Sequence, residues 1–213
     1  MARVLFSGLL GGIAMFIWTQ LAFTALPLGE AGIRKIPNET RVLETLQKNI
    51  GEESGFYVFP GPLLGSTQTD EEEAKARDQL VESVARYPSG VLIYNAAGTR
   101  PIKMFRWLSV EFFTELTEAI LAVLLLSRTH LSTFGARTAF VLATGILVAI
   151  GTNIPDWNWY GFSESYILAN MLIQTTGFLC VGLVAALVLR KQPLPATGWP
   201  RFWPGLSRGT SNR

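Results

Sequence analysis

Three glutamates interrupt an apolar stretch of the chain and have the residue type and spacing to do chemistry. Glu111, Glu115 and Glu118 are four and three residues apart, so on a helix their carboxyls lie on one face. A carboxyl at the depth of a lipid bilayer costs roughly 2.5–3.5 kcal/mol on the membrane-insertion scale. Such residues need polar partners, a water-filled cavity or a functional role.

The carboxyls fit three kinds of site. They can hold helices together through hydrogen bonds to polar groups of other spans. Alternatively, the span begins late, so that its first turns stand in the headgroup zone with Glu111 exposed and only Glu118 deep. They can line a proton or cation pathway. They can also offer oxygen ligands to a metal, although His130, the single histidine, is predicted on the opposite side of the membrane. The candidate site combines the carboxyls with amides of other predicted spans: Glu111, Glu115, Glu118, Asn153, Asn170 and Gln174. Further polar residues of the predicted spans are Thr19, Gln20 and Thr144.

Four long apolar runs, of which the second contains the three glutamates, predict membrane spans. The chain has 213 residues, of which 49% are hydrophobic and 16% charged, against about 25% charged in an average soluble domain. Each run approaches or exceeds the roughly 20 residues that cross a hydrocarbon core. The predicted spans cover residues 4–26, 107–127, 138–154 and 166–189.

The charges on the connecting segments predict the orientation of these spans. Basic residues and no acidic ones precede the first span, separate the second from the third and follow the fourth. The segment between the third and fourth spans holds Asp156 and Glu164 and no Lys or Arg. The positive-inside rule therefore places both termini in the cytoplasm and residues 27–106 outside it. The first span is predicted to be an uncleaved anchor, since its apolar run is longer than that of a signal peptide and Phe23 breaks the cleavage pattern.

Residues 27–106 predict a small α+β domain. Asn38 and Thr69 are the expected N-caps of two amphipathic helices, and each helix is followed by a Ser-Gly pair and a short strand. The predicted strands are 56–59 and 91–94, and the two helix–strand halves resemble each other as in a duplication. Because a two-stranded sheet is marginally stable alone, we expect this domain to pack on its helices, the membrane surface or a second copy.

An aromatic segment joins the last two predicted spans. It contains Asp156, Trp157, Asn158, Trp159 and Tyr160. Trp and Tyr favour the membrane interface, which explains much of this composition. The segment holds more aromatic and amide side chains than an interfacial anchor requires, which suggests a lid or interface loop over the glutamates. Residues 190–213 contain four prolines, cannot form a long helix and are predicted as a cytoplasmic tail.

Three segments carry a resemblance to known proteins: Gly11-Gly12 in the first span, residues 54–60 and residues 155–162. Together they resemble a group of uncharacterised bacterial four-span inner-membrane proteins of about 200 residues. The resemblance implies a bacterial cytoplasmic membrane and supplies no activity or site residue.

The sequence thus predicts an integral membrane, mainly α protein with a four-helix transmembrane bundle and a small α+β extracytoplasmic insert. The expected parts are transmembrane helix 1 in 1–26, the insert in 27–106, helices 2–4 in 107–189 and the tail in 190–213.

The predicted function is that of a non-enzymatic accessory or interaction subunit. We expect it to contact the lipid bilayer, other membrane proteins or a second copy, and no nucleic acid, since the net charge is only +2. The alternative is a small proton- or cation-coupled transporter with Glu118 as its deep site. An intramembrane enzyme is less favoured, because no nucleophile or cofactor signature accompanies the carboxyls. No cofactor is expected, and the single cysteine, Cys180, allows no intramolecular disulfide.

Overall fold

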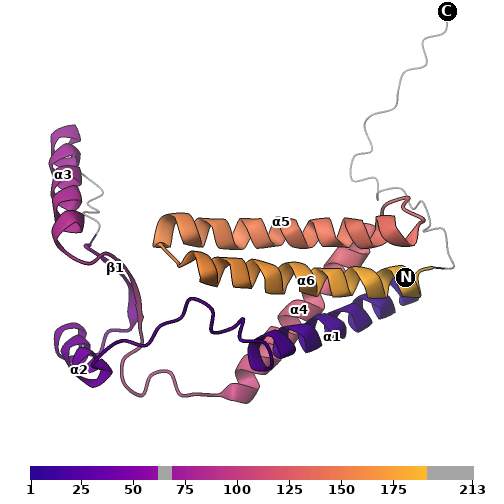
Figure 1. The fold of residues 1–213 in the computed structure, drawn as a ribbon, viewed down its shortest axis with the longest axis horizontal. Coiled ribbons are helices and arrows are strands. Elements are labelled where there is room, and N and C mark those ends of the chain that lie inside the picture. Colours follow the sequence, from indigo (N-terminus) through magenta and orange to yellow (C-terminus); the bar gives the residue numbers. More distant parts are fainter. Residues whose placement is uncertain (62–68, 191–213) are drawn as a thin grey trace, which may run out of the picture. The chain divides into compact units, whose positions relative to one another are not determined.

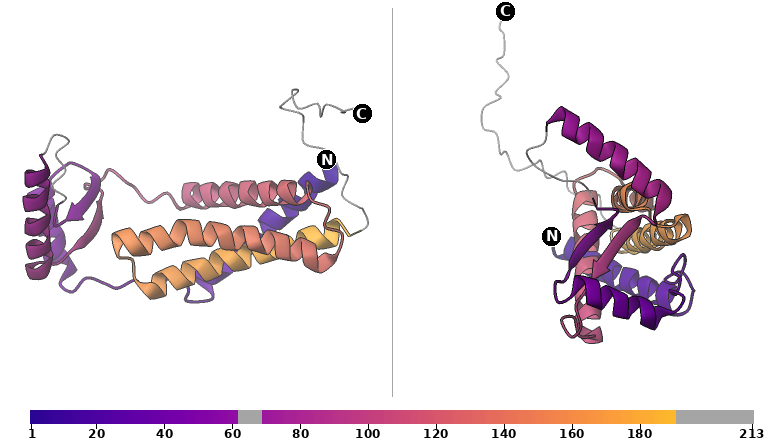
Figure 2. Two further views of the ribbon diagram at one scale, coloured as in Figure 1. Left: turned by 90° about the horizontal axis from the view of Figure 1, so that it is seen from above. Right: turned by 90° about the vertical axis from the view of Figure 1, so that its left-hand side faces the viewer.

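The computed structural model describes residues 1–61 and 69–190 and is mainly helical, with 69% of these described residues in helices and one two-stranded sheet. The chain forms two compact units (Figures 1 and 2). The helical unit contains Met1–Ala31, Phe105–Asn153 and the described residues from Leu168 to Arg190. The α+β unit contains Gly32–Met104 and Ile154–Ile167. The predicted tail, apart from Arg190, lies outside the described residues.

Four long helices build the helical unit and lie side by side in Figures 1 and 2. They are α1 (Ala2–Thr24), α4 (Met104–Leu126), α5 (Phe134–Tyr160) and α6 (Glu164–Val188). Small side chains such as Ala119, Val123, Val181 and Ala185 fill the buried core between them. Small residues let helix axes approach closely, as is usual in membrane bundles.

Large apolar side chains point outward from the same four helices. Leu147 of α5 and Leu168 of α6 are 72% and 65% exposed, and Phe113 of α4 is also exposed. Within the described residues, α1, α5 and α6 are long and apolar enough to cross a membrane. Three of the four predicted spans therefore have suitable helices. Helix α4 is as long as α1 but carries the three glutamates and is not among these candidates.

The α+β unit contains α2 (Glu39–Ile50), β1 (Gly55–Phe59), α3 (Asp70–Arg86) and β2 (Gly90–Tyr94). The predicted helices and strands of this segment are confirmed, in the predicted order. The strands pair antiparallel, and the glycine that opens each strand faces the aromatic residue that closes the other. The pair is thus symmetric about Tyr57 and Leu92, as a duplication would make it.

The two predicted N-caps differ in how they act. Thr69 caps α3 as predicted, and the Glu72 carboxylate accepts hydrogen bonds from the Thr69 backbone N–H and hydroxyl at 2.9 and 3.2 Å. Asn38 also stands at the N-cap of α2, but its backbone is left-handed at φ 53° and its side chain makes no capping hydrogen bond. The position of Asn38 is confirmed, whereas the expected capping bond is not formed.

The prediction that the aromatic segment is a loop is wrong for residues 156–160. Helix α5 continues through Pro155 to Tyr160, so Asp156, Trp157, Asn158, Trp159 and Tyr160 are all helical. A proline removes one backbone donor, and a long helix tolerates that loss when its other hydrogen bonds persist. Gly161, with a left-handed φ of 69°, ends the helix instead. That this segment forms a lid over the glutamates stays a prediction.

Candidate functional site

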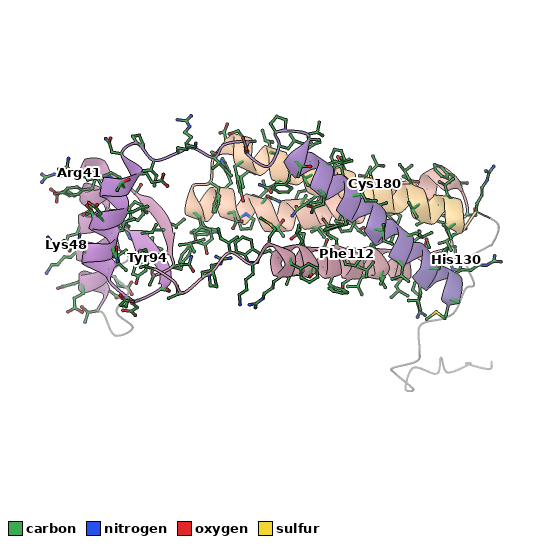
Figure 3. All side chains as sticks on the ribbon, turned by 90° about the horizontal axis from the view of Figure 1, so that it is seen from below. Arg41, Lys48, Tyr94, Phe112, His130 and Cys180 are labelled. Atoms are coloured by element: carbon green, nitrogen blue, oxygen red, sulfur yellow. The ribbon has the colours of Figure 1, made fainter. Side chains whose placement is uncertain are left out.

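Helices α1 and α4 approach closely because glycines of α1 face the backbone of α4. A Cβ added to Gly8 or to Gly12 would lie 2.8 Å from the Cα of Ile120 or of Leu116, respectively. Phe16 packs edge to face on Phe112, with ring centroids 5.2 Å apart (Phe112 is labelled in Figure 3). This contact fixes which face of α4 is turned toward α1.

Glu115 lies in this α1–α4 contact. The Thr19 hydroxyl donates a hydrogen bond to Oε1 of Glu115 at 2.5 Å. The Glu115 side chain is only 5% exposed, and its second oxygen, Oε2, is buried with no hydrogen-bond partner among the described residues. A buried carboxyl oxygen left open in this way can take a proton, a water molecule or a cation.

The other two glutamates have different surroundings. Glu111 is exposed and Glu118 is half-buried. Glu118 lines a hollow of about 550 Å³ on the outer face of α4, together with Arg106, Thr114 and Thr117. The Thr117 hydroxyl already donates to the carbonyl of Phe113 at 2.7 Å. The three carboxyls therefore differ in burial along α4 and do not form one enclosed cluster.

The amides predicted as partners of the glutamates bond to each other. Asn153 of α5 donates from Nδ2 to Oε1 of Gln174 on α6 at 2.8 Å, and it also donates to the carbonyl of Ala149. Thr152 donates to the same Gln174 oxygen at 3.3 Å. The predicted site is thus divided into an α1–α4 carboxyl contact and an α5–α6 amide contact. Asn170 lies on α6, one turn before Gln174.

Arg137 is a candidate functional residue in the structure. From the sequence it counted only as one of the basic residues that predict the orientation of the spans. It is 1% exposed, and its guanidinium donates to the carbonyls of Leu131 at 2.9 Å and Leu189 at 2.5 Å. It ties the start of α5 to the end of α6. The sequence feature that could have identified Arg137 is its position in the first turns of an apolar helix, where a charged side chain requires partners.

The metal hypothesis finds no support in the described part of the chain. No group of three or more His, Cys, Asp or Glu side chains there is placed to hold a metal ion. His130 lies in the turn that follows α4, as labelled in Figure 3. Cys180 of α6 is a free, partly buried thiol.

A second hollow lies within the α+β unit. This groove has a volume of about 420 Å³ and is walled by both strands, by α3 and by the last turn of α5. Asn158, Trp159 and Tyr160 of the aromatic segment line it. The rings of Phe56 and Tyr160 meet edge to face at 5.5 Å, which joins the end of α5 to the sheet.

Comparison with protein-family models, with curated proteins and with solved structures finds no match for this chain. The functional argument therefore rests on the contacts described above.

Proposed function

We propose that this chain is a four-span integral membrane protein that acts as an interaction subunit. In this proposal α4 also crosses the membrane, as the second of four spans, both termini are cytoplasmic and the α+β unit stands outside a bacterial inner membrane. The outward apolar side chains of α1, α4, α5 and α6 support a lipid-facing surface. The close glycine contact between α1 and α4 supports a place for α4 in the same bundle.

The observation that carries the interaction role is the exposure of the α+β unit. Neither α2 nor α3 buries a single residue, although both have apolar stripes. Leu43 of α2 and Val81 of α3 are 52% and 64% exposed, and Phe56 and Ile93 of the sheet are exposed as well. Burial of apolar surface contributes about 25 cal/mol per Å², so a partner protein that covers these side chains would stabilise the unit.

A site-specific cross-linking experiment tests this role. A photoreactive amino acid at Val81 should form protein-to-protein cross-links in native membranes, and one at Glu82 should not. Glu82 is a matched control, because it is the neighbouring exposed residue and pairs with Arg86 at 3.0 Å. A chain that purifies as a stable monomer, with equal cross-linking from both positions, would contradict the proposal.

The orientation is tested by labelling single cysteines in a Cys180→Ser background. An impermeant maleimide should react with Glu52→Cys in intact cells and with His130→Cys only after the membrane is opened. Reaction of both positions from outside would refute the proposed topology, since an α4 that spans the bilayer separates them.

Proton or cation transport is the second candidate, favoured by the open Oε2 of Glu115. Flux into vesicles that contain the purified protein and a pH-sensitive dye is the measurement. Glu118→Gln and Glu115→Gln should each abolish flux without loss of folding, whereas Glu111→Gln, at an exposed position, should leave it nearly unchanged. Unaltered flux in the first two variants would remove this candidate.

A further inference from the structure

We propose that the groove of the α+β unit binds an acyl chain of an anionic phospholipid. This inference rests on the proposed function, because it requires α5 to cross a bilayer. The groove's volume of about 420 Å³ lies in the roughly 300–1,000 Å³ range of small-molecule sites. It is large enough for a segment of hydrocarbon chain and too small for a folded partner.

The walls of the groove are mostly apolar and come from separate elements. Val58 and Phe59 belong to β1, Leu80 and Val84 to α3, and Trp159 to α5. Trp159 is 78% exposed, so the groove is open rather than closed around its own side chains. A hydrocarbon chain in the groove would remove this apolar surface from water, which is the driving force for lipid binding.

The place of the groove along α5 points to a lipid. Helix α5 has 27 residues and is about 40 Å long at 1.5 Å per residue, whereas a hydrocarbon core is only about 30 Å thick. When α5 spans the bilayer, its last turn therefore reaches the headgroup zone, where Trp and Tyr are favoured. A groove built on that turn opens where lipid is the most concentrated apolar ligand.

The α+β unit holds more acidic than basic side chains, but the two links that join it to α1 and α4 are basic and favour an anionic headgroup. The link from α1 to α2 carries Arg34 and Lys35, and the link from β2 to α4 carries Arg100 and Lys103. The first link also holds Glu30 and has a net charge of +1, whereas residues 95–103 hold no acidic side chain and have a net charge of +2. Both links join the unit to helices proposed as spans, so these basic side chains stay near the surface, where they attract anionic lipids.

A photoreactive lipid tests the proposal. The full-length protein is reconstituted in phosphatidylcholine vesicles that contain phosphatidylglycerol with a diazirine at the end of one acyl chain. After irradiation, labelled peptides are mapped by mass spectrometry. Labels are expected on the groove, in residues 80–91 and 158–161, in addition to the spans.

Two tryptophan substitutions on α3 provide the comparison. Val84→Trp fills the groove, whereas Val81→Trp adds the same bulk outside its lining. We expect Val84→Trp to lower groove labelling about ten-fold, as the loss of one well-filled contact would, and Val81→Trp to leave it unchanged. Equal labelling of these two variants, or labels confined to the spans, would overturn the proposal.

Further variants keep the proposal testable if Val84→Trp fails to fold, which circular dichroism would reveal. Trp159→Ala removes a wall without adding bulk and should also lower groove labelling. Arg34→Gln with Lys35→Gln should reduce the preference for phosphatidylglycerol over an equally reactive phosphatidylcholine, and an unchanged preference would refute the anionic headgroup. Carbonate extraction separates the two proposals. A protein released from membranes refutes the membrane role, whereas a retained protein with an unlabelled groove refutes only the lipid site.

Discussion

The Thr19 hydroxyl of α1 is the described hydrogen-bond donor to the buried Glu115 carboxyl of α4. Two helices that are distant in sequence are therefore joined by a buried polar contact. Oε2 of Glu115 has no partner in the described residues, so only one of the two carboxyl oxygens is hydrogen-bonded. It can serve as a structural bond and as the place where a proton or cation enters.

Thr19→Val keeps the shape of the side chain and removes the donor. We expect the free energy of unfolding in detergent to fall by about 1 kcal/mol, the usual size of such bonds between membrane helices. Thr19→Ser, which keeps the hydroxyl, should remain closer to the unmodified protein. Equal stability of the valine and serine variants would mean that the Thr19–Glu115 bond contributes nothing to folding.

Gly12→Ala should separate α1 from α4. Its Cβ would lie 2.8 Å from the Leu116 Cα, and a backbone atom cannot rotate away as a side chain can. We expect a loss of roughly 1–3 kcal/mol in unfolding free energy, typical of overpacking. Gly151→Ala is the matched control, since nothing lies within 4 Å of its Cβ position. That variant should be neutral or slightly stabilising, by up to about 1 kcal/mol.

Equal stability of these two alanine variants would contradict the packing of α1 on α4. If Gly12→Ala is as stable as Gly151→Ala, the two helices do not pack through Gly12, and the position of Glu115 against Thr19 loses its support.

The Asn153–Gln174 bond should be measurable as a coupling. Asn153→Leu, Gln174→Leu and the double variant form a thermodynamic cycle for the 2.8 Å bond between α5 and α6. We expect a coupling energy of about 0.6 kcal/mol, with roughly 1.7 as the upper bound seen for such pairs. Thr152 bonds to the same Gln174 oxygen, so Thr152→Val alone should have a smaller effect. A coupling indistinguishable from zero would contradict the described contact.

The elements of the α+β unit could be predicted because their signals are local. The Ser-Gly pairs before β1 and β2 and the Thr69 cap of α3 each act within a few residues. The end of α5 could not be located from such signals. Pro155 suggests an end, whereas the stop depends on the left-handed conformation of Gly161.

The candidate site was predicted only in part because it depends on helix rotation. The spacing of the glutamates placed them on one face of α4, but the glycine contacts of α1 decide that Glu115 faces inward while Glu111 is exposed. The rotation of α5 against α6 likewise pairs Asn153 with Gln174 rather than with a carboxyl. The spacing of Gly8 and Gly12 marks the packing face of α1, but the sequence does not indicate which face of α4 meets it.

Arg137 should be the most sensitive basic residue of the helical unit. Arg137→Leu leaves the carbonyls of Leu131 and Leu189 without this donor, and each unsatisfied buried group costs roughly 1–3 kcal/mol. Because only the bond to Leu189 is fully buried and that to Leu131 is part-buried, we expect a loss of roughly 1–3 kcal/mol in unfolding free energy, measured in detergent. Arg190→Leu is the control, since Arg190 is exposed and directly follows Leu189. Both variants remove one positive charge from the side proposed as cytoplasmic, so any effect on orientation is matched. A similar stability for the two would show that the Arg137 contacts do not hold α5 to α6.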